Sequence, residues 1–222
     1  MNAMILAAGR GERMRPLTDH CPKPLLTAGG QTLLDWHLQR LKAAGFKRII
    51  VNIAWLGEHI RAHLAHHTPA GVEVVISDEG ETGLETAGGI INALPLLGDA
   101  PFLVINADIW TDFDLQSLPA EPEGLAHLVL VDNPSHHPRG DFSLREGRVS
   151  LEDDGGSLTF AGIGCYRPEL FVGSTAGVSP LAPLLRRAIA RSQVTGQHHH
   201  GRWYDIGTPA RLAALDAELS RD

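Results

Sequence analysis

The chain has 222 residues, 43% of them hydrophobic and 20% charged, with a formal net charge of −7. This composition is typical of a globular protein, and the length fits one α/β domain, residues 1–222, better than two. No apolar run approaches the roughly 20 residues of a membrane-spanning helix, and no basic stripe indicates a nucleic-acid partner.

The N-terminal sequence and the cysteines bear on the compartment. Met1–Met4 leads straight into an apolar segment, without the basic region, apolar core and cleavage site of a secretion signal. Cys21 and Cys165 are isolated, which does not suggest a disulfide scaffold. We therefore expect a cytoplasmic protein, and the sequence indicates neither a membrane partner nor an obligate protein partner.

In the first half, short apolar runs alternate with segments of helical periodicity. Strands separated by helices of this length imply right-handed crossovers and a mainly parallel sheet. We expect Thr86 to cap the third of these helices. The predicted strands cover residues 3–8, 48–53, 72–77 and 102–106, and the predicted helices cover residues 32–44, 58–66 and 86–97.

The second half has a different pattern, with fewer helices between its strands. Thr208 and Pro209 suit the N-cap and the first position of the last helix. The predicted elements are strands over residues 126–131 and 158–166, a hairpin over 141–151 that turns at Glu146-Gly147, and helices over 180–192 and 209–220.

Two unusual features each follow a predicted strand. The first strand ends at a Gly-rich loop, and the fourth ends at Asp108. In open α/β sheets, ligands bind beyond the carboxyl ends of the strands. The Gly-rich loop and Asp108 should therefore lie at the same edge of the sheet, which makes this edge the candidate site.

The Gly-rich loop, residues 6–18, matches neither of two common phosphate-binding motifs. A third glycine of the dinucleotide fingerprint would fall at Met14, and no Gly-Lys-Ser/Thr follows as in a P-loop. Small residues allow a ligand to approach the backbone, and the three arginines of this loop can neutralise a polyphosphate. Taken alone, such a loop is more often a tight turn, and Lys23 between two prolines is more often part of a rigid surface turn.

Asp108 and Asp205 are the candidate metal ligands. Asp108 ends the fourth strand, and Asp205 precedes the last helix. Carboxylates in such places suit Mg²⁺, which prefers oxygen ligands together with substrate phosphates. Each aspartate alone is equally well explained as a turn or capping residue.

The combined pattern, Leu-Ala-Ala-Gly-x-Gly-x-Arg-Met-x-Pro-Leu-Thr followed by Pro-Lys-Pro, resembles the signature of the sugar-1-phosphate nucleotidyltransferases. The resemblance implies an α/β fold, a Rossmann-like three-layer sandwich with a mainly parallel, mixed central sheet. Residues up to about 110 would bind the nucleotide, and residues 111–222 the sugar. Arg13 would hold the pyrophosphate portion, Lys23 the phosphate under attack, and Asp108 and Asp205 a Mg²⁺ ion. The family usually has Gly-Asp where this chain has Ala107-Asp108.

The same resemblance implies further binding residues. Backbone groups around residues 83–88 would read uracil or thymine, and the residues do not separate uridine from deoxythymidine. The implied sugar-binding residues are Gly140, Asp141 and Gly162. The implied nucleotide-binding residues are Leu6, Ala7, Ala8, Gly9, Gly11, Glu12, Met14, Arg15, Gly83, Ala87, Gly88 and Asn106.

Two observations bear on the acceptor sugar. Glucose-specific relatives carry a Glu-Lys pair after the hairpin, whereas this chain has Glu152-Asp153-Asp154-Gly155-Gly156 and no lysine there. Stretches such as Ala54–Gly57, Leu84–Thr86 and His136–Phe142 resemble the branch of the family that joins UTP to N-acetylmuramic acid 1-phosphate in cell-wall recycling. We therefore expect these two substrates, with Mg²⁺ as cofactor.

Several alternatives remain open at this point. Within the family they are uridylyl or thymidylyl transfer to glucose 1-phosphate, guanylyl transfer to mannose 1-phosphate, and cytidylyl transfer. Outside it are a non-catalytic nucleotide-sugar sensor and a dinucleotide-binding oxidoreductase, which the broken fingerprint disfavours. The histidines at 63, 66 and 67 and at 198–200 are expected to be surface residues, because no cysteine accompanies either group as in many zinc sites.

Overall fold

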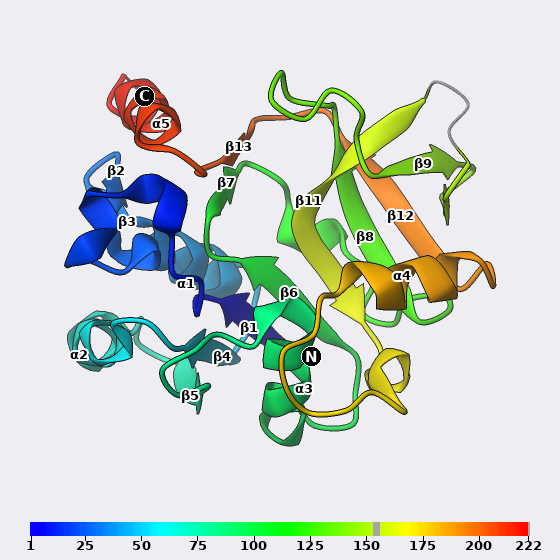
Figure 1. The fold of residues 1–222 in the computed structure, drawn as a ribbon, viewed down its shortest axis with the longest axis horizontal. Coiled ribbons are helices and arrows are strands. Elements are labelled where there is room, and N and C mark those ends of the chain that lie inside the picture. Colours follow the sequence, from blue (N-terminus) through cyan, green and yellow to red (C-terminus); the bar gives the residue numbers. More distant parts are fainter. Residues whose placement is uncertain (153–155, 222) are drawn as a thin grey trace.

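The computed structural model describes residues 1–152 and 156–221 (Figure 1). In this part of the chain, nine strands form one mixed sheet with the order β5-β4-β1-β6-β11-β8-β12-β10-β9. The strands of this sheet are β1 Asn2–Leu6, β4 Arg48–Ile53, β5 Glu73–Asp78, β6 Phe102–Asn106, β8 Ala126–Val131, β9 Phe142–Arg145, β10 Arg148–Ser150, β11 Ser157–Tyr166 and β12 Val194–His199.

Two smaller ladders and five α-helices complete the regular structure of the described residues. The ladders pair β2 (Thr27–Ala28) with β3 (Gln31–Thr32), and β7 (Ile109–Thr111) with β13 (Trp203–Asp205). The helices are α1 Leu33–Ala43, α2 Gly57–His67, α3 Glu85–Leu97, α4 Ala182–Ile189 and α5 Pro209–Leu219.

The first four strands of the large sheet are parallel. β1 lies between β4 and β6, and Leu6 at its end is level with both Asn52 and Asn106. Helices cross over between these strands, as the alternating pattern predicts. β4, β1 and β6 therefore end at the same edge of the sheet. There the chain continues from β1 into the Gly-rich loop and from β6 toward Asp108.

The second half of the sheet is mixed. β11 runs antiparallel to β6 and β8, while β12 is parallel to β8. β9 pairs with β10 and also returns to β11 through Leu158 and Phe142, so β11, β8, β12, β10 and β9 form a closed ring of pairings. The register of β11 against β8 shifts between Phe160 and Gly164, which marks a bulge.

The helices cover both faces of the large sheet (Figure 1). Leu38 of α1 and Ile60 of α2 belong to one core cluster, together with alternate residues of β1, β4 and β6. Ile90 of α3 and Leu185 of α4 belong to a second cluster on the other face. Alternation along the strands separates the two clusters, and the result is the expected three-layer sandwich.

A third cluster joins the ends of the chain. Met14, Leu33 and Leu215 pack around Trp110 of β7, and this cluster places α5 against the β2–β3 ladder. Residues of the Gly-rich loop and of the C-terminal helix are thereby held beside β7, the strand that follows Asp108.

The structure corrects some of the expected elements. The first strand ends at Leu6 instead of residue 8, and β7, β12 and β13 were not predicted. Thr86 does not cap α3, because the helix begins at Glu85 and has no side-chain cap. Thr208 does cap α5 and accepts a hydrogen bond from the Arg211 N–H, as predicted. No described helix is long and apolar enough to span a membrane.

Candidate active site

A cavity of about 640 Å³ opens at the carboxyl ends of β1, β4 and β6. The fold thus brings the Gly-rich loop, Lys23 and Asp108 to one place, as the sequence predicts. The lining consists of Leu6, Ala7, Ala8, Gly9, Arg10, Gly11, Glu12, Arg13, Met14, Lys23, Pro24, Asn52, Trp55, Glu79, Glu81, Thr82, Gly83, Glu85, Thr86, Asn106, Ala107, Asp108 and Gly207.

The Gly-rich loop is a compact turn whose backbone is accessible at one point. Gly11 has φ 66°, and a Cβ there would lie 3.0 Å from Cγ2 of Thr18 and 3.2 Å from Cβ of Lys23. The carbonyl of Gly11 accepts hydrogen bonds from the Met14 N–H and the Thr18 hydroxyl, both at 2.8 Å. A Cβ at Gly9 would meet no atom within 4 Å, so space for a ligand adjoins this residue.

Lys23 and Asp108 form the charged centre of the cavity. Lys23 Nζ lies 2.5 Å from Asp108 Oδ2, and the two residues are 85 positions apart in the sequence. The Lys23 side chain is only 10% exposed, whereas that of Asp108 is 37% exposed. Because the lysine stem is buried, its ammonium group is fixed beside the carboxylate, and both face the same region of the cavity.

The backbone of Asp205 lies beside the backbone of Asp108, but the Asp205 carboxylate has partners other than Lys23 and Asp108. β13 pairs with β7 so that Asp205 is opposite Ile109, and the Ile206 N–H donates to the Asp108 carbonyl at 2.8 Å. Asp205 Oδ2 lies 2.6 Å from Arg211 Nη1 and 3.2 Å from His136 Nε2. Asp205 does not line the cavity in this structure, although its neighbour Gly207 does.

A buried polar network connects the loops on opposite sides of the cavity. Asn52 Oδ1 accepts from the Ala7 N–H at 2.6 Å, and Asn52 Nδ2 donates to Glu79 Oε1 at 2.6 Å. The other oxygen of Glu79 accepts from the Leu84 N–H at 2.7 Å. The sequence analysis missed this network. Its signal was Asn52, which follows the apolar run of residues 49–51 in β4 and is itself only 2% exposed.

A buried histidine lies beneath the segment that carries Asp108. His37 of α1 is 2% exposed and faces the backbone of Ala107 and Ile109. Burial, and secondarily the charge of Arg40, lowers the pKa of His37 to about 4. The backbone offsets part of this shift, but neither ring nitrogen makes a hydrogen bond of normal geometry. His37 is therefore neutral near pH 7.

Comparison with known proteins shows the family of this chain. The family model described as nucleotidyl transferase matches residues 2–140. The chain belongs to the nucleotidyl transferase family. It is 54% identical to the N-acetylmuramate alpha-1-phosphate uridylyltransferase of Neisseria meningitidis serogroup B, over 98% of this chain and 97% of that protein. It is 35% identical to the protein of the same name from Caulobacter vibrioides, over 98% and 96% of the two chains.

Solved structures of other nucleotidyltransferases share the fold. A Bacillus anthracis structure described as a glucose-1-phosphate thymidylyltransferase superposes with a TM-score of 0.87 at 21% identity, covering 100% of this chain and 96% of that one. The inositol-1-phosphate CTP transferase of T. maritima gives a TM-score of 0.80, also at 21% identity, covering 99% and 94%. These likenesses confirm the expected fold class.

The cavity at the ends of β1, β4 and β6 includes most of the predicted nucleotide-binding residues, but three lie elsewhere. Arg15 is exposed and pairs with Asp19 at 2.7 Å. Ala87 and Gly88 are buried, and their N–H groups donate to the Ser179 carbonyl at 2.9 and 3.0 Å. In this structure these two amides fix the start of α3 instead of facing the cavity, and their predicted contact with a base stays a prediction.

The predicted sugar-binding residues of the nucleotidyltransferase do not line this cavity either. A Cβ on Gly140 would lie 2.6 Å from Asn133 Oδ1, and one on Gly162 would lie 2.8 Å from Asn106 Nδ2. Asp141 Oδ2 accepts from the Phe160 N–H at 2.8 Å, and its Oδ1 lies 3.1 Å from His137 Nε2. Gly140 and Asp141 thus have structural contacts outside the cavity, whereas Gly162 lies directly against Asn106 of the cavity lining. The Glu-Lys comparison falls largely on residues 153–155, which lie outside the described residues.

Proposed function

We propose that the chain transfers the uridylyl group of UTP to N-acetylmuramic acid 1-phosphate, which yields the UDP-sugar and pyrophosphate. The names of its 54% and 35% identical relatives, which cover nearly the whole chain, support this substrate pair. The observation that carries the chemistry is the Lys23–Asp108 pair in the cavity beside the Gly-rich loop. The N-acetylmuramate substrate in the relatives' names fits a role in peptidoglycan recycling, and the free thiols Cys21 and Cys165 fit a cytoplasmic enzyme.

The proposed reaction is a direct displacement at phosphorus. An oxygen of the sugar 1-phosphate attacks the α-phosphorus of UTP, and the bond to the oxygen that bridges to the β-phosphate breaks. Pyrophosphate leaves with that electron pair. No general base is required, because the attacking phosphate is already anionic, so catalysis rests on positioning and charge neutralisation.

The chain supplies fixed positive groups for this reaction. We assign Lys23 to the α-phosphate oxygens, because its buried stem holds the ammonium group at one point of the cavity. Arg13 is exposed at the cavity lining and would pair with the leaving pyrophosphate. Loop amides near Gly9, where space adjoins the backbone, would contact the nucleotide.

Asp108 and Asp205 fit a Mg²⁺ ion by their chemistry. Both are carboxylates, Asp205 ends β13 while Asp108 directly precedes its partner strand β7, and the Asp108 side chain is open to the cavity. When bound, Mg²⁺ would neutralise charge on the reacting phosphates. Asp205 would have to exchange its contacts with Arg211 and His136 to take part.

A substrate panel tests the proposal. Pyrophosphate release is measured with UTP, dTTP, GTP and CTP, each combined with the 1-phosphates of N-acetylmuramic acid, N-acetylglucosamine, glucose and mannose. We expect the highest kcat/KM for UTP with N-acetylmuramic acid 1-phosphate. Preference for another pair would replace the substrate assignment, and no turnover with any pair in the presence of Mg²⁺ would favour a nucleotide-sugar sensor.

A further inference from the structure

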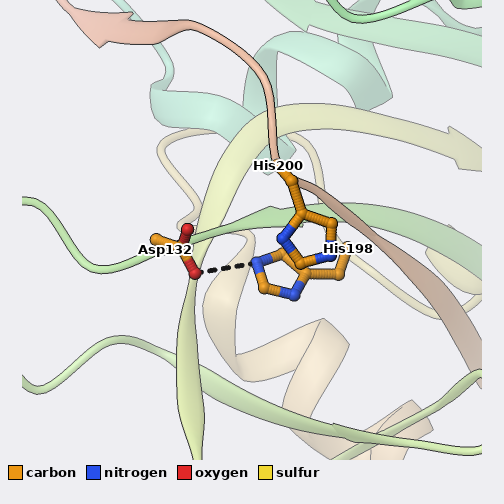
Figure 2. Close-up of side chains that lie close together, drawn as sticks. All are labelled: Asp132, His198 and His200. Carbon is orange, nitrogen blue, oxygen red and sulfur yellow. Dashed lines mark ion pairs between the residues drawn. The ribbon is translucent and has the colours of Figure 1, made fainter.

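A second group of metal-binding side chains lies away from the Lys23–Asp108 cavity. Asp132 directly follows β8, His198 lies in β12, and His200 directly follows β12. Their nearest ligand atoms all lie within 4.8 Å of one another. Figure 2 shows the carboxylate of Asp132 and the two imidazole rings turned toward a common point. None of the three lines the cavity or has a role in the reaction proposed above.

The pairing of β12 with β8 explains why these three side chains meet. β12 is parallel to β8, and His198 pairs with Leu130 while His199 pairs with Val131. Side chains alternate along a strand, so His198 and His200 point to one face and His199 to the other. The His199 ring confirms this alternation, because its Nε2 lies 2.9 Å from Asp112 Oδ1 on the opposite face.

The backbone around the cluster is held in place. Asn133, which follows Asp132, donates through Nδ2 to the Ser157 carbonyl at 2.8 Å, and its Oδ1 accepts from the Thr159 hydroxyl at 2.8 Å. On the β12 side, Phe113 packs edge-on against the His199 ring, with the ring centroids 5.3 Å apart. These contacts limit the positions of Cα of Asp132, His198 and His200, so a bound ion would need only side-chain rotation.

One buried nitrogen of the cluster has no hydrogen-bond partner among the described residues. His198 Nε2 is buried and lies 3.0 Å from Asp132 Oδ1, yet it is not aligned to form a hydrogen bond with it. Buried polar atoms in proteins nearly always have a partner. The rings of His198 and His200 lie 3.8 Å apart, centroid to centroid, which brings a second nitrogen donor to the same point.

From this geometry we propose that Asp132, His198 and His200 bind a divalent transition-metal ion of the zinc class. Two imidazoles and one carboxylate are donors that suit Zn²⁺, Co²⁺ or Ni²⁺ better than Mg²⁺, which prefers an all-oxygen set. In a tetrahedral zinc site with bonds of about 2.0–2.2 Å, ligand atoms lie roughly 3.3–3.6 Å apart. The present separations of up to 4.8 Å close to this range by rotation of the side chains of Asp132 and His200, which are both exposed.

The proposed ion would tie the end of β8 to the end of β12. The segment that follows Asp132 carries His136, which contacts Asp205. An ion at the cluster therefore stabilises the start of this segment by linking two strands through side chains. The site is separate from the Mg²⁺ site in its residues and in its donor chemistry.

The test measures Co²⁺ and Zn²⁺ binding to the full chain, free of any added histidine tag and stripped with a chelator. Visible absorption of Co²⁺ reports the coordination geometry, and calorimetry with Zn²⁺ gives stoichiometry and affinity. We expect one tight site per chain that survives in Asp108→Asn. His198→Gln, His200→Gln and Asp132→Asn should each weaken it by more than about tenfold.

Matched histidine variants serve as controls. His199→Gln changes the neighbouring histidine on the opposite face, and His66→Gln changes an exposed histidine of α2. Both should keep the tight site, and Zn²⁺ should raise the Tm of both but not that of His200→Gln. Unchanged affinity in His198→Gln and His200→Gln, or an equal loss in His66→Gln, would overturn the proposal. Circular dichroism of each variant shows whether a loss of binding arises from unfolding.

Discussion

The two halves of the large sheet use their motif residues differently. At the ends of the parallel strands β1 and β6, the Gly-rich loop, Lys23 and Asp108 face a common cavity. In the mixed half, Gly140 and Asp141 lie against segments of the same half, whereas Gly162 lies against Asn106, a residue of β6 that lines the cavity. Parallel strands joined by crossovers direct their carboxyl ends to one place, whereas hairpins direct successive turns to opposite ends. The motif residues of the first half therefore meet at one cavity, while the sugar contacts expected of the second half stay a prediction.

The largest expected effect concerns the charged centre of the parallel half. Asp108→Asn should reduce kcat/KM by at least about 100-fold, because it removes a carboxylate ligand of the proposed Mg²⁺ ion and so weakens charge neutralisation on the reacting phosphates. The unfolding transition should change little, since the Asp108 side chain is 37% exposed. Steady-state pyrophosphate release measures the effect. The control is Asp99→Asn, which changes an exposed aspartate outside the cavity. Comparable losses in both variants would show that the cavity is not the catalytic centre.

A second prediction concerns the stability of the parallel half at acidic pH. The pKa of His37 is about 4 in the folded state, below the ordinary value of 6.5. Between these two pKa values the unfolded chain binds more protons, so the free energy of unfolding falls as the pH drops from about 6.5 to about 4. The fall should be on the order of 3 kcal/mol.

Urea unfolding of the wild type, His37→Gln and the exposed control His66→Gln measures this dependence. His37→Gln should unfold with a flatter pH profile, even if it is less stable at pH 7. A profile as steep as that of the wild type would show that other groups cause the acid sensitivity.

A third prediction concerns the buried network through which Asn52 connects the Gly-rich loop to Glu79. Asn52→Ala leaves the Ala7 N–H and one oxygen of Glu79 without their partner, which should cost about 2 kcal/mol of unfolding free energy. The two loops should also lose their mutual position, so the KM for UTP should rise. Asn92→Ala on the exposed side of α3 is the matched control. An unchanged KM in a folded Asn52→Ala variant would separate this network from nucleotide binding.

The smallest expected effect lies in the mixed half. Asp141→Ala removes the acceptor of the Phe160 N–H and should lower the unfolding free energy by about 1 kcal/mol. Asp141→Asn keeps an oxygen acceptor and should restore most of this loss. An increased KM for the sugar phosphate in the stable Asp141→Asn variant would establish the sugar contact that the family resemblance implies. It would also weaken the contrast between the two halves.

Much of the fold could be predicted because its signals are local. The strand over residues 48–53 has the predicted bounds, and Thr208 caps α5 as its residue type suggests. β12 could not be predicted, since its sequence Val-Thr-Gly-Gln-His-His lacks apolar alternation and its pairing with β8 is a tertiary effect. β7 and β13 are three residues each, too short for a pattern to show.

The site shows the same limit. The Gly-rich loop and Asp108 were predicted to lie together because each follows a strand, and Lys23 was added by the family resemblance of the Pro-Lys-Pro segment. The contacts of Asp205 with His136 and Arg211 could not be predicted, because they join segments that are distant in the sequence. The surroundings of Asp132, His198 and His200 were missed for the same reason, since their side chains meet only through the pairing of β12 with β8.

The central claim is that Asp108 and Asp205 share the ion that serves nucleotidyl transfer, opposite Lys23. A crystal structure with Mn²⁺ in place of Mg²⁺ and bound UDP-sugar tests it, because the anomalous signal locates the ion. We expect a peak in contact with carboxylate oxygens of both aspartates, with Lys23 Nζ on the phosphate adjoining the nucleoside. A peak with Asp205 still paired to Arg211 and His136, or none beside Asp108, would contradict it.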